Sequence, residues 1–425
     1  MFLPQIAGFR QITLQPPVIV LYNTNSLLHE KEPSPVKKEV HLTAVTVTSE
    51  DVIQRLLDTF EAKTDIHVVM KMVGWETYRG EFVQMALHKT PGDVAMVGAP
   101  ITSDLIGMNA LRPFSTSEIY SMGGNAAFLP SRWQSAIRPG SPDVWAVPWV
   151  LDIRMIYFWR DLMEQAGVDE AQAFADADHM EDTLARLQSK HGGYPLAVPH
   201  DRYSLLHLVS SFIWAEGSDL FTEDGKRVIF HEEAGLRGIR RYFQMLRFAN
   251  PNLLETWVNR APFNQREVAV MVGNGWAAFS PSDENIGSAA ILGQSYVGGT
   301  DLMIWQHSRN ESAALDLVRF LTHPETVLEL NQSSELLPMR VQQIEAMAAD
   351  SKPIRRSIAR AALSGHTFPC VSMVGLIEDR LSVALLNIQQ ELFKNPAADL
   401  DAQLDALLRS RIVALGNRTN LSLGA

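Results

Sequence analysis

The hydrophobic pattern of residues 40–97 alternates between strand and helix. Residues 41–47 and 66–73 are rich in β-branched and apolar side chains, and residues 93–97 form a third short apolar run. Between the first two strands, Ser49 is a candidate N-cap with Glu50 and Asp51 in the first helical turn. Apolar side chains follow at helical spacing, and residues 75–89 repeat that spacing. The first helix predicts a buried face of Val52, Ile53, Leu56, Leu57 and Phe60. This alternation predicts an α/β fold with a parallel sheet covered by helices.

The loops that follow the first and third strands are candidates for a binding site. In open sheets of this kind, ligands bind beyond the carboxyl ends of the strands. We therefore expect a pocket at the loops after Val47 and Val97. The polar candidates in these loops are Ser49, Glu50, Thr102 and Ser103.

Residues 143–168 hold two apolar runs and the start of a helix. Because proline cannot donate to a central ladder, the first run should end at Pro148 or lie at a sheet edge there. A chain that crosses between domains has this pattern, so we interpret the segment as a hinge. Trp149 follows directly, and its alternative role is ordinary core packing. Asp152 and Arg154 should point to the same face of an extended segment, where the alternative is a structural salt bridge between them.

Later segments predict further helices and strands. A helix should end at Gly192 and Gly193, an apolar helix should reach Trp214, and Asp224 with Gly225 indicates a hairpin turn. Residues 302–305 should form a strand and 311–321 a helix. Beyond residue 342, two or three helices are expected. They carry too few heptads for a coiled coil.

Composition limits the possible functions. A chain of 425 residues suits two domains, and a net charge of −11 argues against nucleic-acid or acidic-membrane partners. The one cysteine, Cys370, excludes an internal disulfide and a thiolate zinc site, and we expect no metal or cofactor. Residues 1–39 lack a convincing signal peptide and are expected to be a disordered leader. No stretch is long and apolar enough to span a bilayer.

The segment 143–168 resembles the crossover of the extracellular solute-binding proteins of ABC importers, sugar-binding family. Residues 296–340 and 261–279 also resemble that family, although Arg266 and Val270 stand where its members carry glycine and methionine. Trp276 takes the position of an aromatic residue that stacks on a sugar ring in relatives such as the maltose-binding protein. The matched crossover positions are Val147, Pro148, Trp149, Asp152, Arg154, Tyr157, Asp161, Ala166 and Gly167.

The resemblance implies two discontinuous α/β lobes, the periplasmic-binding-protein type II fold, which close around a ligand by a hinge. The first lobe would comprise residues 40–147 and 298–340, and the second 148–297 and 341–425. The ligand would lie between the lobes. Its contacts in the cleft are expected from Trp149, Asp152, Arg154, Trp276, Gly298 and Gly299, together with the four loop residues above.

The expected function is capture of a sugar or related polyol for delivery to membrane permease subunits, by a monomer in the periplasm or outside the cell. An enzyme on the same fold, with Cys370 or an Asp/Glu pair as catalyst, is a second hypothesis. Cys370 has apolar neighbours and no nearby base, which is typical of a structural cysteine. A receptor for a charged solute, such as a glycerol phosphate, a polyamine or ferric ion, is a third. Ferric ion would want a tyrosine pair that is absent here, whereas a phosphate would favour Arg154 and the helix start near Ser49.

Overall fold

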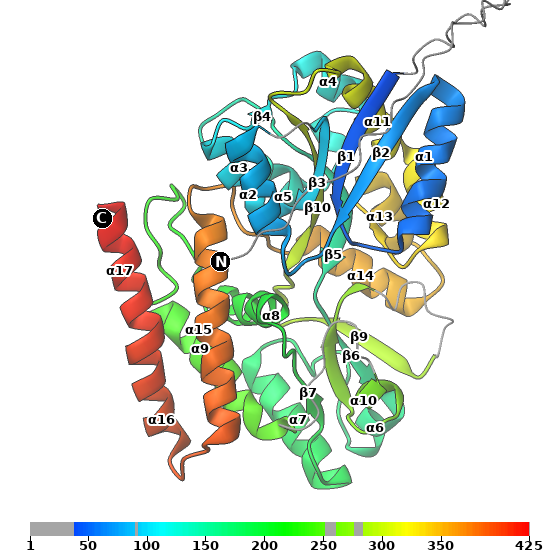
Figure 1. Cartoon of the computed structure of the whole chain (residues 1–425). Coiled ribbons are helices and arrows are strands. Elements are labelled where there is room, and N and C mark those ends of the chain that lie inside the picture. Colours follow the sequence, from blue (N-terminus) through cyan, green and yellow to red (C-terminus); the bar gives the residue numbers. More distant parts are fainter. Residues whose placement is uncertain (1–37, 90–91, 251–260, 276–283, 425) are drawn as a thin grey trace, which may run out of the picture. The chain divides into compact units, whose positions relative to one another are not determined.

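The computed structural model describes residues 38–89, 92–250, 261–275 and 284–424, which contain two separate β-sheets (Figure 1). The first sheet has the order β11-β5-β10-β3-β1-β2, with β4 paired to β10. β1 is parallel to β2 and β3, whereas β10 is antiparallel to β3, β4 and β5. The predicted parallel sheet is therefore right for β1–β3 and wrong beyond them, because β10 returns from distant sequence in the opposite direction. The strands are β1 (Lys38–Val45), β2 (Ile66–Val73), β3 (Val94–Gly98), β4 (Leu111–Arg112), β5 (Val147–Ile153), β10 (Val297–Trp305) and β11 (Leu337–Pro338).

The second sheet has the order β7-β8-β6-β9. β6 runs antiparallel to β8 and β9, and β7 is parallel to β8. Its strands are β6 (Met155–Trp159), β7 (Leu196–Ala197), β8 (Val270–Gly273) and β9 (Ile286–Ala290).

The helix after β1 buries all five apolar positions expected of it. α1 packs on β2, α11 and α12. Ser49 is its N-cap residue, but the Ser49 side chain makes no capping hydrogen bond. α2 begins at Tyr78, three residues later than expected. The helical segments up to residue 134 and after β10 are α1 (Glu50–Thr64), α2 (Tyr78–His88), η1 (Ala99–Ile101), α3 (Thr102–Gly107), α4 (Thr116–Ser121), η2 (Asn125–Ala127), α5 (Pro130–Gln134), α11 (Glu311–Thr322), α12 (Pro324–Ser333) and α13 (Val341–Ala348).

The helices that pack around the second sheet come from the middle and the end of the chain. α8 packs against α9 and α15, and α14 packs against β9. As expected, α7 is followed by Gly192 as its C-cap residue. These helical segments are α6 (Arg160–Gln165), α7 (Ala177–His191), α8 (Arg202–Ala215), α9 (Glu233–Met245), η3 (Leu246–Phe248), α10 (Ala261–Asn264), α14 (Pro353–Ser364), α15 (Val374–Lys394), α16 (Leu400–Leu407), the π-helical segment η5 (Leu408–Val413) and α17 (Ala414–Leu423).

The chain passes from the first sheet to the second at Arg154. Of the two alternatives expected at Pro148, a strand end is wrong, because β5 continues through Pro148 to Ile153, and a position at the sheet edge is confirmed. Pro148 is tolerated because β5 pairs there with β10 alone, while β11 joins the other side of β5 only at Val150 and Leu151. The buried apolar side chains form two clusters. The first core contains the faces of α1, α2, α3 and α11, and the second contains those of α7, α8, α9 and α15.

Candidate functional site

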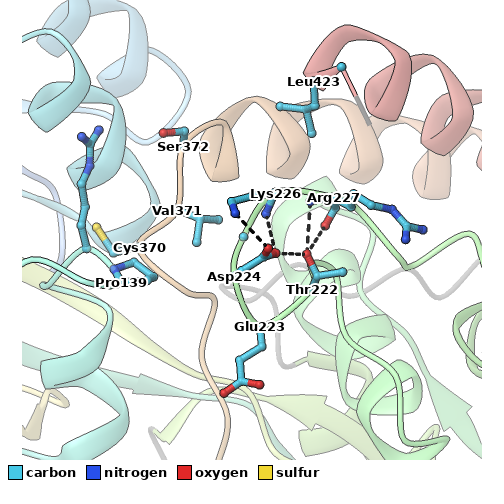
Figure 2. Close-up of a pocket in the computed structure, with 13 residues that line it drawn as sticks. Pro139, Thr222, Glu223, Asp224, Lys226, Arg227, Cys370, Val371, Ser372 and Leu423 are labelled. Atoms are coloured by element: carbon cyan, nitrogen blue, oxygen red, sulfur yellow. Dashed lines mark hydrogen bonds and ion pairs between the residues drawn. The ribbon is translucent and has the colours of Figure 1, made fainter.

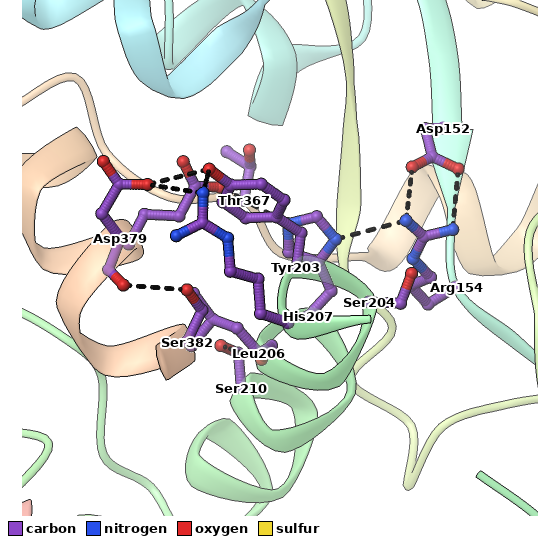
Figure 3. A network of polar contacts seen from close by, with 12 residues as sticks. Asp152, Arg154, Tyr203, Ser204, Leu206, His207, Ser210, Thr367, Asp379 and Ser382 are labelled. Carbon is purple, nitrogen blue, oxygen red and sulfur yellow. Dashed lines mark hydrogen bonds and ion pairs between the residues drawn. The ribbon is translucent and has the colours of Figure 1, made fainter. Parts of the chain in front are cut away.

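The crossing between the sheets carries a bidentate ion pair. Asp152 is the penultimate residue of β5, and Arg154 follows the end of that strand. Arg154 Nη2 lies 3.1 Å from Asp152 Oδ2, and Arg154 Nη1 lies 3.4 Å from Oδ1 (Figure 3). The Arg154 backbone N–H donates to the carbonyl of Tyr296. Both side chains lie on the same side of the segment, as predicted, and they pair with each other.

His207, on α8, lies beside this ion pair. Arg154 Nη2 is 3.4 Å from His207 Nδ1, and the imidazole stacks on the Tyr296 ring with centroids 3.8 Å apart. Burial, and then the charge of Arg154, hold the pKa of His207 well below its usual value. Because guanidinium groups only donate, Nδ1 accepts and the proton of the neutral ring is on Nε2. Nε2 then faces Glu378 Oε1 at 3.6 Å.

Two consecutive acidic residues of α15 complete the network. Burial raises the pKa of Glu378 to about 8, so this carboxyl group is largely protonated at neutral pH. Asp379 accepts a 2.8 Å hydrogen bond from the Tyr203 hydroxyl, and Arg202 Nη2 lies 3.5 Å away (Figure 3). Burial and the bond to Asp379 raise the pKa of Tyr203, which keeps its hydroxyl as a donor.

Arg79 links this network to the first core. Arg79 follows the buried Tyr78 on α2, and its Nη2 lies 2.5 Å from Asp104 Oδ2 of α3. Its Nε lies 3.1 Å from Asp379 Oδ2 of α15. α2 and α3 contribute to the first core, and α15 contributes to the second. One guanidinium therefore joins carboxylates from elements of both cores.

Trp75 stands at the carboxyl ends of β1, β2 and β3. Its Nε1 donates to the Thr46 carbonyl at 2.7 Å, and its ring meets Tyr78 edge-on. A Cβ atom at Gly98, the last residue of β3, would lie 3.0 Å from the Trp75 ring. The aromatic rings thus cover the strand ends where the sheet topology places a ligand.

A second group of rings lies on the side of α8. The Trp214 ring stacks on His366 with centroids 5.3 Å apart, and Phe368 packs against His207, Trp214 and Tyr296. Apolar ring faces and charged groups are therefore adjacent here, which suits a ligand with both apolar and hydroxyl-bearing faces.

Four polar atoms of the network are buried without a hydrogen bond in the described part of the chain. They are Arg79 Nη1, Arg154 Nε, His207 Nε2 and Glu378 Oε2. Buried polar groups normally have partners, so a concentration of unsatisfied groups is typical of a functional site. Three of these atoms are donors, and Glu378 supplies a donor or an acceptor according to its protonation.

The loop residues expected to bind ligand have mixed surroundings. Ser49 and Glu50 are both exposed. Thr102 is fully buried, and its hydroxyl donates to Asp301 Oδ2 at 3.4 Å. Ser103 is also buried, and its hydroxyl makes no hydrogen bond within the described residues.

The predicted aromatic and glycine positions also have structural roles. Trp149 is buried, and its Nε1 donates to the Leu321 carbonyl at 2.8 Å. A Cβ atom at Gly298 would meet the Tyr296 ring, and Gly299 has φ 137° close to the Val150 carbonyl. These contacts require glycine for packing, with or without a ligand. Trp276 lies outside the described residues, and the role of each of these positions in binding stays a prediction.

Sequence reasoning did not single out several residues of the network as site residues. Trp75 and Tyr78 were recognised only as apolar positions of a helix. Arg79 sits among them, and one arginine within a helical pattern gave no signal. The consecutive Glu378 and Asp379 at the start of an apolar helix were the one available sign, because such a helix rarely buries an acid without a partner. The remaining members of the network are Asp104, Arg202, Tyr203, His207 and Tyr296.

A cavity of about 1130 Å³ lies elsewhere (Figure 2). Arg138, the 222–227 turn, residues 370–372 and the end of α17 line it, and it shares no residue with the network. Burial raises the pKa of the Cys370 thiol to about 12, which keeps it protonated and poorly nucleophilic. Among the described residues no group of His, Cys, Asp and Glu is arranged to hold a metal ion, and no helix is long and apolar enough to cross a membrane.

The profile of bacterial extracellular solute-binding proteins matches residues 46–327. The chain belongs to this family. The match includes β5, β6, α8 and Arg79, while Glu378 and Asp379 lie beyond it. Compared by sequence with curated proteins, this solute-binding protein has no significant match.

Solved structures confirm the two-lobed fold for this solute-binding protein. The sugar-binding protein MalE from Xanthomonas citri is 19% identical and superposes with a TM-score of 0.73, over 90% of this chain and 98% of that one. The GacH receptor of Streptomyces glaucescens, studied unliganded and with acarbose, is 20% identical, with a TM-score of 0.71 over 89% and 99%. A solute-binding protein from Thermotoga lettingae bound to α-D-tagatose is 18% identical, with a TM-score of 0.70 over 88% and 98%.

Proposed function

We propose that this solute-binding protein captures a sugar or related polyol and delivers it to the permease subunits of an ABC importer. The network between α2, α8 and α15 carries the proposal. Elements of both cores meet there, with aromatic rings beside buried guanidinium and carboxyl groups whose hydrogen-bonding capacity is incompletely used. MalE-like structures, some of them with bound sugars, supply the precedent.

A neutral polyhydroxyl ligand fits the charge balance of the network. Arg79, Arg154 and Arg202 lie among Asp104, Asp152 and Asp379, and each carboxylate has a guanidinium partner. A sugar hydroxyl both donates and accepts, so it can use a guanidinium and a carboxylate at once without adding net charge. Aromatic rings such as Trp75 can cover the apolar face of the sugar.

The crossing at Arg154 supports hinge closure. Ligand contacts on both sides would favour the closed form by their differential affinity for it. In this proposal the lobes comprise residues 40–147 with 298–340 and residues 148–297 with 341–425. Trp276, Asp152 and Arg154 would be ligand contacts in the cleft. Ser49, Glu50, Thr102, Ser103, Trp149, Gly298 and Gly299 stay candidates around it.

The same proposal includes a monomer without catalytic turnover, located in the periplasm or outside the cell. A receptor needs its faces free for the permease. The protonated thiol of Cys370 favours binding over covalent catalysis. Size-exclusion chromatography with light scattering tests the monomer, and a stable dimer would count against it.

A charged solute is the second candidate. The guanidinium groups of Arg79 and Arg154 favour a phosphate ester such as glycerol phosphate, and Asp152 and Asp379 would favour a polyamine. The pairing of the arginines with carboxylates weakens both alternatives, because an ion must compete with an existing partner.

A thermal-shift screen of sugars, polyols, phosphate esters and polyamines tests the proposal first. Calorimetry with the best ligand then compares Trp276→Ala and Asp152→Ala with the exposed control Asp182→Ala. Loss of a stacking ring should cost about 1 kcal/mol or more, roughly fivefold in affinity, while the control stays unchanged. Unchanged affinity in both site variants, with folding intact, would remove the site. A response to phosphate esters or polyamines alone would favour the second candidate.

A further inference from the structure

A second cavity, of about 430 Å³, lies between α14, β9 and the start of α6. One face of α14 provides half of its lining, and β9 provides Ser288 and Ala290. No residue of the network around Asp379 lines it. The proposed binding of a solute in the cleft therefore does not explain the charged side chains that line this cavity.

Three arginines line this cavity with a single carboxylate. Arg160 Nε lies 3.4 Å from Glu170 Oε2, so that pair is loose. Arg356 Nη1 donates to the backbone carbonyls of residues 350 and 351 at 2.9 and 2.7 Å, which fixes the guanidinium. Its other N–H groups make no hydrogen bond within the described residues. The Arg360 side chain is exposed and makes no ion pair or hydrogen bond within the described residues. In a chain of net charge −11, this lining has a local positive excess.

A buried hydroxyl group adds an uncharged donor to the cavity. Ser288 Oγ is buried and has no hydrogen-bond partner within the described part of the chain. Ser357 Oγ donates to the Ser288 carbonyl at 3.0 Å, which ties α14 to β9 at the cavity wall. This strand hydroxyl and the fixed guanidinium of Arg356 on α14 give directional donors on two sides of the cavity.

We propose that this cavity binds a small oxyanion of the phosphate class. Guanidinium groups bind such anions through paired, charge-assisted hydrogen bonds, and neighbouring N–H and O–H donors can serve the remaining oxygens. Arg160, Arg356 and Arg360 supply the charge, and Ser288 supplies the hydroxyl. The Glu170 carboxylate partly neutralises the positive charge of the cavity, and this limits the affinity for an anion. The site is independent of the sugar cleft.

Titration of the full chain with inorganic phosphate at constant ionic strength, set with chloride, tests the proposal. Calorimetry should show saturable binding in the low millimolar range, about 1–10 mM. Arg360→Gln and Ser288→Ala should each weaken it about threefold or more, because each removes a donor to the anion. Arg409→Gln, an equal charge change at an exposed position of η5, should leave it unchanged.

Three results would overturn the site. The first is an absence of saturable phosphate binding. The second is equal weakening by Arg409→Gln, which would indicate general electrostatic attraction. The third is loss of phosphate binding in Arg79→Gln with binding intact in Arg360→Gln, which would place the anion in the cleft. Melting temperatures of the variants identify any that are misfolded, and Ser288→Ala then repeats the test without a charge change.

Discussion

Arg79 Nε lies 3.1 Å from Asp379 Oδ2 and connects α2 to α15. The two side chains are 21% and 27% exposed, so water only partly screens the pair. Asp104 Oδ2 contacts Nη2 of the same guanidinium. The pair thus joins elements of the two cores. In the proposed hinge closure, its energy would favour the closed form.

Arg79→Ala should lower the free energy of unfolding. The change leaves Asp104 and Asp379 without their shared cation in a largely desolvated place, and burial already raises the pKa of Asp104. A cost of about 1–3 kcal/mol is expected, measured by chemical denaturation. Arg237→Ala is the control, because Arg237 pairs with Glu216 and Glu233 but is 49% exposed, so its loss should cost less than about 1 kcal/mol. Equal losses would contradict a role for Arg79 in joining the cores.

Glu378→Gln should change how stability depends on pH. Burial raises the pKa of Glu378 to about 8 in the folded protein, from an ordinary value of 4.5. The folded state therefore holds the proton more tightly, and this contribution is fully present below pH 4.5 and is lost as pH rises through 8. Glutamine keeps a neutral side chain at every pH. The free energy of unfolding of the wild type should fall relative to the variant across this window, by at most about 1.4 kcal/mol per pH unit.

Denaturation of both proteins at several pH values provides the measurement. His207, Arg79 and Asp379 surround Glu378, but they are present in both proteins, so the difference between the curves isolates the carboxyl group. Parallel curves between pH 5 and 8 would contradict the raised pKa.

Local patterns in the sequence were sufficient to predict individual helices and strands. The helix with Val52, Leu56 and Phe60 and the strand at residues 66–73 follow from periodicity, because one buried face imposes a fixed spacing on each element. The direction of β10 could not be predicted that way. Strand polarity depends on where a distant segment returns, and Val297–Trp305 pairs with strands that are far away in sequence.

The candidate site was harder to predict from the sequence than the helices and strands. Asp152 and Arg154 are neighbours in sequence, and their shared side follows from strand geometry. Arg79 and Asp379 are 300 positions apart, and no local rule pairs them. Thr102 follows a strand end as expected, but Asp301 and Arg132 from other segments surround it, and that environment decides its role.

Trp149→Phe should destabilise the protein and leave ligand affinity within about twofold of the wild type. Trp149 is buried in the first core, and its Nε1 donates to the Leu321 carbonyl at 2.8 Å. Phenylalanine leaves that carbonyl without its partner and leaves space beside it, at a cost of about 1–3 kcal/mol. Denaturation and calorimetry with the ligand from the screen measure the two effects. A large loss of affinity with normal stability would instead support the predicted ligand contact.

Arg132→Met should be more damaging than Thr102→Val, although both residues contact Asp301. Arg132 and Asp301 are fully buried, and Arg132 Nη2 lies 2.7 Å from Asp301 Oδ1. Arg132 Nη1 also donates to Ser135 and to Thr367, which lies between the ring residues His366 and Phe368. Methionine fills similar space but leaves a buried carboxylate without its counter-charge, at a cost of about 3–5 kcal/mol.

Thr102→Val removes only a 3.4 Å hydrogen bond to the same carboxylate and should cost about 1 kcal/mol. Burial raises the pKa of Asp301 and Arg132 opposes that rise, so loss of Arg132 should raise the pKa of Asp301 further. The double variant Arg132→Met with Asp301→Asn, which removes the unpaired charge, should then recover part of the lost stability. Chemical denaturation of the single and double variants measures the order of their free energies of unfolding. A double variant less stable than Arg132→Met alone would show that packing around Arg132, and not its charge, holds the residue 367 segment in place.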